Sequence, residues 1–428
     1  MEMYELAKKL FPICRSIRGE GVRQTLKILQ DEIPEMNIIE VPTGTKVFDW
    51  TIPKEWVIRE AYIENSKGEK IIDFKVNNLY VMGYSIAVDR YVSLEELKKY
   101  IYVEENDKEA IPYVTSYYKE RYGFCMSMEQ RDSLNEDIYH MYIDSELKNG
   151  SLTYGEVILS GKTEKEIFLS TYVCHPSMAN NELSGPCVVT ELCKMLRNMN
   201  NREYTYRIVF IPETIGAITY ISKNMNNMKK NIIAGFNVSC VGDDRTYSYV
   251  ESRYANTLAD KVAVNVLKFH YPQFRKYTFL DRGSDERQYN APGVDLPVCA
   301  ICRSKYGEYA EYHTSKDDLN LISKEGLNGA FEVYKQCILA LENNAYYRIN
   351  VLCEPQLGKR NLYPTISKKG GYDKIRAMTN FIAYADGTND LIDISNIIGV
   401  PVKELIPIVK VLRECGLLLK ENVWKERN

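Results

Sequence analysis

Between residues 155 and 345, short apolar runs alternate with longer amphipathic segments, and this alternation constrains the fold more than any other feature of the chain. Runs such as "EIFLSTYV", "YRIVFIPE" and "VDLPVCAICRS" are typical of buried strands. Segments such as "GPCVVTELCKMLRNM" and "EGLNGAFEVYKQCILALENN" repeat apolar residues at helical spacing. Strands that alternate with helices favour a mostly parallel sheet with helices on both faces. We therefore predict an α/β fold in this part of the chain.

Two stretches depart from this alternation and predict further domains. Residues 38–128 are rich in β-branched and aromatic residues punctuated by Pro and Gly, which predicts a β-rich inserted domain. The α/β domain then comprises residues 1–37 plus 129–345. Residues 362–428 show a helix-turn-helix rhythm before a final short strand, which predicts a winged-helix domain. Since the sheet and its closing helix are complete by Asn344, we expect the α/β domain to fold without the C-terminal domain.

Composition and charge restrict the location and the partners. The net charge of −3 argues against a chain built as a whole to bind nucleic acid or an anionic membrane. Eleven irregularly spaced cysteines are typical of free thiols in a reducing compartment. The chain has no apolar signal-peptide stretch at its start, and no run approaches the ~18 apolar residues of a membrane span. We expect a cytoplasmic protein without membrane contact.

The winged-helix domain carries little net positive charge on its expected third helix. Lys403, Lys410 and Arg413 are offset there by Glu404 and Glu414. Neutralising DNA phosphates requires an excess of basic side chains, so this balance argues against a DNA-binding role. We expect contact with a protein partner or with a second copy of the chain.

Polar residues gather in loops at the ends of the predicted strands. These loops read "CHPSMANNELSG", "IPETIG", "VGDDR", "DRGSDERQY" and "YGEYAEYHTSKDDL". The carboxyl ends of parallel strands face one crevice, so side chains distant in sequence converge there. The residues expected to converge are His175, Glu182, Glu213, Asp285, Glu286 and His313. Two imidazoles and a carboxylate form the ligand set of a catalytic zinc, and a further carboxylate can act as general base.

Each loop taken alone also fits a purely structural interpretation. His175 before a proline is typical of a core residue that ends a strand. Glu213 in "PETIG" can be a first-turn helix carboxylate, and "GSDERQY" a charged helix entry. Cys299 and Cys302 lie in an apolar strand pattern with no second pair nearby, which favours buried thiols. The shared sheet edge is what favours a functional site.

The order of these motifs resembles that of the zinc aminopeptidases of the bacterial leucyl aminopeptidase and glutamate carboxypeptidase type. His175 matches the first His of that family, "NELSG" its bridging Asp loop, and Glu213 the first residue of its Glu-Glu pair. "SCVGDD" matches the strand-end Asp region, "GSDERQYNAPGVDLP" the Ser-Asp-His stretch, and His313 in "YHTSKDDL" the late His. The chain resembles in particular the bacterial aminopeptidase-like proteins with a β-rich insertion and a C-terminal winged helix. The resemblance implies a three-layer αβα zinc-peptidase-like domain.

Four positions depart from the family pattern. Asn181 stands at the bridging Asp, Thr214 at the second Glu, Ser239 at the strand-end Asp and Glu286 at the His of the Ser-Asp-His stretch. A two-zinc site lacks the negative charge it needs without the first three. The resemblance then implies about one zinc per chain. Its ligands would come from the set His175, Asn181, Glu182 and His313. Glu182 is the best candidate to complete the site beside the two histidines, since Asn181 contributes only a weak neutral oxygen.

The resemblance implies a zinc-dependent aminopeptidase-like hydrolase that acts on a small peptide, aminoacyl or related amide substrate. Glu213 would carry the proton from the attacking water to the leaving amine. The expected substrate contacts are Arg282, Asp285, Glu286, Arg287, Arg303, Tyr306, Tyr309 and Tyr312. Two alternatives stay open: a catalytically degenerate binding protein for an amino-acid or sugar-modified ligand, and a regulator that acts through the winged helix.

Overall fold

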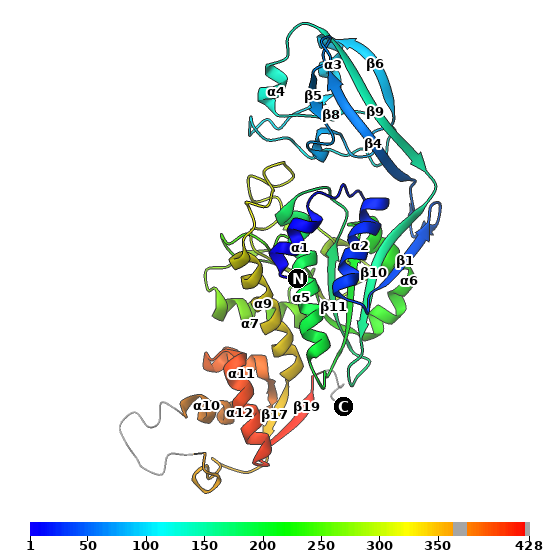
Figure 1. The fold of residues 1–428 in the computed structure, drawn as a ribbon. Helices are drawn as coiled ribbons and strands as arrows, with labels where there is room; N and C mark the ends of the chain where they lie inside the picture. The colour runs from blue at the N-terminus through cyan, green and yellow to red at the C-terminus, as the bar shows by residue number, and fades with distance from the viewer. Residues whose placement is uncertain (363–374, 424–428) are drawn as a thin grey trace.

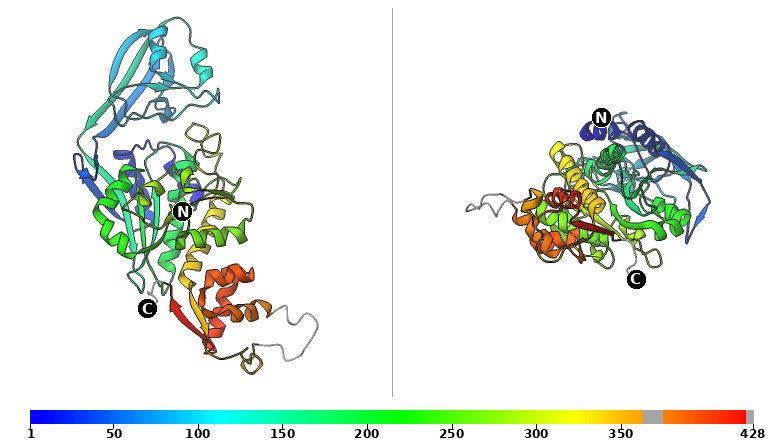
Figure 2. Two further views of the ribbon diagram at one scale, coloured as in Figure 1. Left: turned by 180° about the vertical axis from the view of Figure 1, so that it is seen from behind. Right: turned by 90° about the horizontal axis from the view of Figure 1, so that it is seen from below.

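The computed structural model describes residues 1–362 and 375–423. Figure 1 shows three parts in a row: a β-rich part at the top, an α/β part in the middle and a small helical part at the bottom. The view from behind in Figure 2 shows the same order. Within the described residues, no helix combines the length and the apolar character that crossing a membrane requires.

The middle part is built on an eight-stranded sheet with the order β1-β10-β12-β11-β13-β16-β14-β15. Its strands are β1 (Asn37–Pro42), β10 (Ser151–Leu159), β11 (Glu166–Tyr172), β12 (Thr205–Ile211), β13 (Ile232–Asn237), β14 (Ser248–Val250), β15 (Arg275–Tyr277) and β16 (Val298–Cys302). Strands β12, β11, β13 and β16 run parallel and form its centre, whereas β1 and β10 are antiparallel additions at one edge. The prediction of a mostly parallel sheet is confirmed.

Helices cover both faces of this sheet. They are α1 (Met3–Leu10), α2 (Glu20–Glu32), α5 (Ser184–Asn198), α6 (Ile215–Asn231), α7 (Leu258–His270), α8 (Glu286–Tyr289) and α9 (Lys324–Asn343). Successive residues of a strand point to opposite faces. In β11, Ile167 and Leu169 belong to the hydrophobic cluster that contains α1, α5, α7 and α9, whereas Phe168 and Tyr172 belong to the cluster that contains α6. The three-layer αβα architecture is therefore confirmed.

The β-rich part, which we call the inserted domain (residues 43–150), lies between β1 and β10. Its main sheet has the antiparallel order β5-β4-β9-β6. Its elements are β2 (Lys46–Val47), β3 (Trp50–Thr51), β4 (Glu55–Glu64), β5 (Lys70–Asp73), β6 (Val88–Ser93), α3 (Leu94–Leu97), β7 (Ile101–Tyr102), β8 (Phe124–Cys125), α4 (Met128–Asp132) and β9 (Ile138–Lys148). The sequence predicted that this domain begins at residue 38 and ends at residue 128, whereas the structure places these boundaries at residues 43 and 150. Strand β1 pairs with β10 of the large sheet, and β9 pairs with β4 of the inserted sheet. The predicted boundaries missed this because strand composition does not reveal which sheet a strand joins.

The C-terminal part is a winged helix, as predicted. It contains β17 (Ala345–Ile349), α10 (Arg376–Tyr384), β18 (Asp386–Asp390), α11 (Leu391–Ile398), α12 (Val402–Glu414) and β19 (Leu418–Asn422). Strand β17 is the middle strand of the sheet β18-β17-β19, so this part begins at Ala345 and not at residue 362. Residues 363–374 and 424–428 of the predicted domain lie outside the described residues.

The winged helix shares a hydrophobic core with the α/β domain. Leu391, Leu405 and Leu412 belong to the same buried cluster as residues of α7 and α9. Polar contacts add to this interface: Lys261 Nζ of α7 lies 2.6 Å from Asp390 Oδ2 and 2.7 Å from an oxygen of Asp393. The shared core argues against the expectation that the α/β domain folds alone.

Deleting the chain after Asn344 is therefore expected to destabilise the remainder. The truncation exposes apolar side chains of α7 and α9 that α11 and α12 now cover. We expect aggregation on expression, or a thermal midpoint lower by about 10 °C or more, since a loss of several kcal/mol shifts a chain of this size by such an amount. Circular dichroism melts beside the full-length chain test this. A truncated protein that stays monodisperse and melts at the parent temperature would contradict it.

Candidate active site

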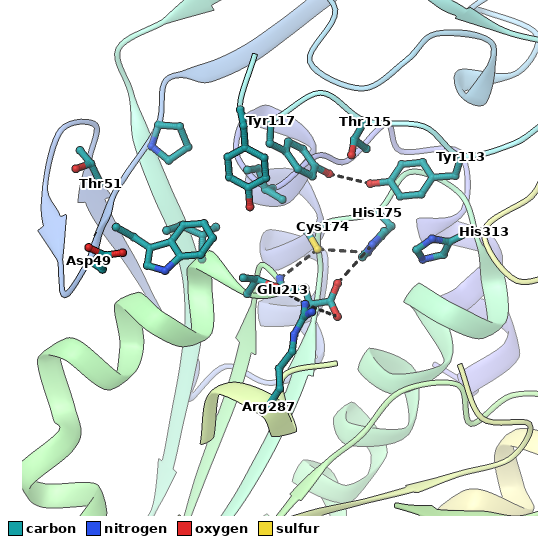
Figure 3. Close-up of a pocket in the computed structure, with 16 residues that line it drawn as sticks. Asp49, Thr51, Tyr113, Thr115, Tyr117, Cys174, His175, Glu213, Arg287 and His313 are labelled. Atoms are coloured by element: carbon teal, nitrogen blue, oxygen red, sulfur yellow. Dashed lines mark hydrogen bonds and ion pairs between the residues drawn. The ribbon is translucent and has the colours of Figure 1, made fainter. Parts of the chain in front are cut away.

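Four of the five polar strand-end loops meet at a cavity of about 650 Å³ between the α/β domain and the inserted domain (Figure 3), whereas the loop "VGDDR" contributes no residue to its wall. The α/β domain contributes Ile17, Cys174, His175, Glu213, Thr214, Ile215, Arg287 and His313 to its wall. The inserted domain contributes Asp49, Trp50, Thr51, Pro53, Tyr113, Thr115, Tyr117 and Tyr118. His175 follows β11 and Glu213 follows β12, so two parallel strands deliver these side chains to the same sheet edge.

His175 is buried and held from two sides. Its Nδ1 lies 2.8 Å from Glu182 Oε2, and its backbone carbonyl accepts a hydrogen bond of 2.8 Å from Arg15 Nε. Nε2 of the same ring lies 3.7 Å from Glu213 Oε2. Burial disfavours the charged ring, but the hydrogen bond to Glu182 and the nearby carboxylates outweigh burial and raise the pKa of His175. Glu182 thus orients the ring and leaves Nε2 on the Glu213 side.

Arg15 is a fully buried cation behind His175, and it comes from the loop between α1 and α2. Its Nε lies 3.7 Å from Glu182 Oε1, and its two terminal nitrogens donate to the carbonyls of Leu10 at 2.8 Å and Ser177 at 3.4 Å. Burial lowers the pKa of Arg15, and the charge of Glu182 opposes that effect. Arg15 lies outside the polar strand-end loops, so the sequence pattern carried no signal for this role.

Asn181 and Glu182 lie in a π-helical turn, Ala179–Leu183, that Asp317 holds in place. The carboxylate of Asp317 accepts hydrogen bonds from the backbone N–H groups of Asn180 at 2.6 Å and Asn181 at 3.0 Å, and from Tyr309 Oη at 2.8 Å. Burial raises the pKa of Asp317 to about 7, although these hydrogen bonds oppose the shift. Asn181 Oδ1 and Glu182 Oε1 are buried acceptors with no hydrogen-bond partner among the described residues.

Glu213 lies on the cavity wall next to two cationic or protonatable groups. Its Oε1 is 4.0 Å from Arg287 Nη2, and its backbone N–H donates to Cys174 Sγ at 3.2 Å. Figure 3 shows the side chains of His175, Glu213 and Arg287 pointing toward one another. Burial raises the pKa of Glu213, while the charges of His175 and Arg287 oppose that rise.

Thr214 connects this carboxylate to Asp285 and Arg287. Its N–H donates to Asp285 Oδ1 at 2.7 Å, and its hydroxyl accepts from Arg287 Nη2 at 2.7 Å. Asp285 is fully buried, and burial together with the charge of Glu213 raises its pKa well above the usual range. Arg287 is thereby fixed at the cavity wall, where its other nitrogens can meet a substrate anion.

His313 approaches from the opposite side. Its ring centre lies 5.4 Å from that of His175, and its ring stacks on Tyr312 with centres 3.9 Å apart. Burial and the neighbouring His175 lower the pKa of His313 to about 3. The imidazole is therefore neutral at neutral pH, which is the form that binds metals.

Five predicted substrate contacts have structural partners instead and do not line the cavity. Arg282 packs on Phe279 at 4.9 Å, and Arg303 is buried over the ring of Tyr247 at 4.0 Å. Tyr306 Oη donates a hydrogen bond to Glu286 Oε1 at 2.5 Å, which occupies both side chains. Tyr309 Oη donates to Asp317. Asp285 and Tyr312 do not line the cavity either, so Arg287 is the predicted contact that does. The sequence pattern placed all eight predicted contacts at one edge of the sheet, but it could not predict the direction of their side chains.

One group of side chains among the described residues could hold a divalent cation. Ligand atoms of Cys174, His175 and Glu182 lie within 4.8 Å of one another, which makes this a possible metal site. Burial raises the pKa of the Cys174 thiol far above its usual range, so it disfavours the thiolate that a metal needs. Outside that group, Asn181 Oδ1 is a buried oxygen with no hydrogen-bond partner among the described residues. The neutral ring of His313 has its centre 5.4 Å from that of His175. Thr214 and Ser239, which the sequence comparison aligned with carboxylate ligands, carry no charge.

The inserted domain's part in the site was missed by the sequence analysis. Tyr113 and Tyr117 line the cavity, and their hydroxyls lie 2.8 Å apart. Burial raises the pKa of both hydroxyls well above the usual range, so both keep their protons. The only signal was the run "IPYVTSYY", which looked like ordinary strand composition.

Several loop residues around the site adopt left-handed backbone angles that favour glycine. The φ angles are +53° at Ser177, +49° at Met178, +62° at Thr214, +53° at Cys240 and +57° at His313. A side chain at such an angle strains the chain, and strain of this kind clusters at functional sites. The surrounding hydrogen bonds must hold these loops in place.

Two families match the chain. Residues 4–344 match a family described as "Domain of unknown function (DUF4910)", and residues 344–420 match a winged helix-turn-helix family. A Clostridium acetobutylicum protein, named as a polysaccharide biosynthesis protein with an aminopeptidase-like domain, is 46% identical over 397 residues. The match covers 92% of this chain and 90% of that protein.

The fold is also similar to those of solved structures. A crystal structure of a Clostridium acetobutylicum protein described as a peptidase has a TM-score of 0.91 at 44% identity and covers 98% of this chain and 96% of its own. BSAP, a zinc aminopeptidase from Bacillus subtilis, has a TM-score of 0.57 at 12% identity, with 79% of this chain and 94% of BSAP covered. At that identity the likeness to BSAP shows the fold alone.

Proposed function

Because this chain belongs to the DUF4910 family and has the fold of zinc aminopeptidases, we propose that it is a metal-dependent hydrolase of a peptide, aminoacyl or related amide bond. The observation that carries this proposal is the convergence of His175, Glu213 and His313 on one cavity. We assign the metal to His175 Nε2, His313 and the free oxygen of Asn181. Glu182 holds His175 in position from behind.

When bound, a divalent ion supplies a Lewis acid that polarises a carbonyl and makes water more acidic. Glu213 removes a proton from the attacking water, whose oxygen bonds to the carbonyl carbon. The same carboxyl group gives the proton to the leaving nitrogen as the carbon–nitrogen bond breaks. Its raised pKa suits both steps, since a base that is too weak cannot hold the proton between them. Arg287, fixed by Thr214, pairs with an anionic group of the substrate.

The aromatic side of the cavity suggests which amides to test. Trp50, Tyr117 and Tyr118 line the wall that the inserted domain provides. Aromatic faces suit apolar side chains and the C–H faces of sugar rings alike. The relative named for polysaccharide biosynthesis supports including N-acylated amino sugars beside aminoacyl and peptide substrates.

We further propose a cytoplasmic location and a protein-contact role for the winged helix. All eleven cysteines are free, which suits a reducing compartment. On α12, Lys410 lies 4.0 Å from Glu414, so part of its positive charge is already paired. This weak charge suits a protein partner or a second copy of the chain better than DNA.

The purified protein is expected to bind about one equivalent of zinc. The neutral side chains Asn181, Thr214 and Ser239 leave too little negative charge for two ions. Elemental analysis after gel filtration measures this, with His175→Ala as the control that should lose the metal. Two equivalents per chain would contradict the assignment. Metal binding without hydrolysis of any aminoacyl, peptide or N-acyl amino sugar substrate would favour the binding-protein alternative.

A further inference from the structure

The inserted domain is joined to the loop that carries His313. Pro112 and Thr314 form an antiparallel bridge, the N–H of Tyr113 donates to the carbonyl of His313 at 2.8 Å, and the N–H of Ser315 donates to the carbonyl of Ile111 at 2.8 Å. Next to this bridge, Lys316 Nζ lies 2.7 Å from Asp107 Oδ2. A segment about 200 residues away in sequence is thus fixed to a loop of the α/β domain.

This bridge places the ring of Tyr113 against both histidines. Its centre lies 5.2 Å from that of His175 and 5.2 Å from that of His313, in edge-on contacts. Figure 3 shows Tyr113 and Tyr117 together over His175, with their hydroxyls directed at each other. Their hydroxyl oxygens are 2.8 Å apart, and neither has another hydrogen-bond partner among the described residues.

The two hydroxyls hold two protons, and the bond between them uses one. The second proton is therefore free to be donated into the cavity. Tyr113 is the member whose ring touches both histidines, so the arrangement with Tyr117 donating to Tyr113 leaves the free proton nearest to the site.

From this geometry we infer that the Tyr113 hydroxyl, oriented by Tyr117, donates a hydrogen bond to the oxygen that becomes negative when water adds to the substrate carbonyl. This inference rests on the proposed hydrolase function. No proton is transferred in this contact: the hydroxyl keeps its proton and stabilises the anion until the carbon–nitrogen bond breaks. The inserted domain is in this way a catalytic element and not an accessory module.

Tyrosine-to-phenylalanine variants test the assignment because they keep the ring and remove only the hydroxyl. Loss of one oxyanion donor lowers kcat by about 100-fold or more in other hydrolases. We expect about a 100-fold loss of kcat in Tyr113→Phe, with KM within about twofold of the parent. Tyr117→Phe should lose about tenfold, and the double variant should be no slower than Tyr113→Phe, since both act through one hydroxyl.

A second readout is the affinity for a phosphinic acid analogue of the best substrate, measured by calorimetry. Its anionic oxygen stands for the carbonyl oxygen after water has added, so its Kd should rise about as much as kcat falls. Tyr91→Phe, on the exposed outer face of the inserted sheet, is the matched control and should change neither quantity. Melting temperatures check that each variant is folded.

The outcomes separate this inference from the proposed function. If the parent hydrolyses a substrate and Tyr113→Phe matches it in kcat and in phosphinate affinity, the tyrosine assignment is overturned while the hydrolase survives. Equal losses of kcat in the two single variants that add up in the double variant would overturn the shared-hydroxyl arrangement. If the parent hydrolyses no substrate, both proposals fall together.

Discussion

Replacing Glu213 by glutamine is expected to lower hydrolysis at least about 100-fold, the scale of a lost general base. Glutamine keeps the size and most of the hydrogen-bonding reach of glutamate, but its amide oxygen cannot hold a proton. Metal content should remain that of the parent, because the metal is assigned to His175, His313 and Asn181. Steady-state kinetics on the substrate that the parent cleaves best, with elemental analysis of the same samples, measure both.

His175→Ala and His313→Ala provide the comparison. Each removes an imidazole ligand, so both should lose metal together with activity. A Glu213→Gln protein with full activity would refute the assigned proton transfer. One that lost its metal would instead make Glu213 a ligand, which its position 3.7 Å from His175 Nε2 allows.

Replacing Arg15 by methionine is expected to have the largest effect on stability. Removing one partner of a buried ion pair leaves the other charge unpaired and costs about 3–5 kcal/mol. Here the loss also removes the donors to the carbonyls of His175, Leu10 and Ser177. Urea denaturation should show a large drop in the midpoint, and hydrolysis should fall with it because the His175 loop loses its anchor.

Two further variants make this test specific. Arg59→Met breaks a solvent-exposed pair with Asp144 and should leave the midpoint close to that of the parent. Adding Glu182→Gln to Arg15→Met removes the buried carboxylate charge that Arg15 no longer balances, and it should recover part of the lost stability. If Arg15→Met unfolded at the parent midpoint, the cation would have no anchoring role.

The alternation of apolar runs and amphipathic segments was sufficient to predict the αβα layers, because each buried strand and each helix carries its own periodicity. The convergence of His175, Glu213 and His313 followed from the rule that parallel strands end at one edge. The domain boundaries were harder to predict from the sequence. The sequences of strands β1 and β9 do not indicate which sheet each joins, and only long-range pairing assigns β1 to the large sheet and β9 to the inserted sheet.

Side-chain direction was the other limit. Arg303 lies at the end of β16 and Tyr306 in the loop that follows, both at the expected edge of the sheet. Their partners are Tyr247 and Glu286, which the spacing of residues in the sequence does not identify. Conversely, Tyr113 reaches the site through a bridge between residues far apart in sequence. Contacts of this kind depend on the complete tertiary arrangement, and a local motif does not encode them.

The left-handed loop residues around the cavity have a consequence for protein engineering. A non-glycine residue in this conformation is disfavoured by about 1–2 kcal/mol relative to glycine. Thr214 and His313, at φ angles of +62° and +57°, are therefore sites where a glycine would remove backbone strain. The same replacement would remove the hydroxyl that fixes Arg287, or the second imidazole. Selection for thermal stability alone would therefore favour glycine at these two positions, and the selected variants would lose the proposed activity.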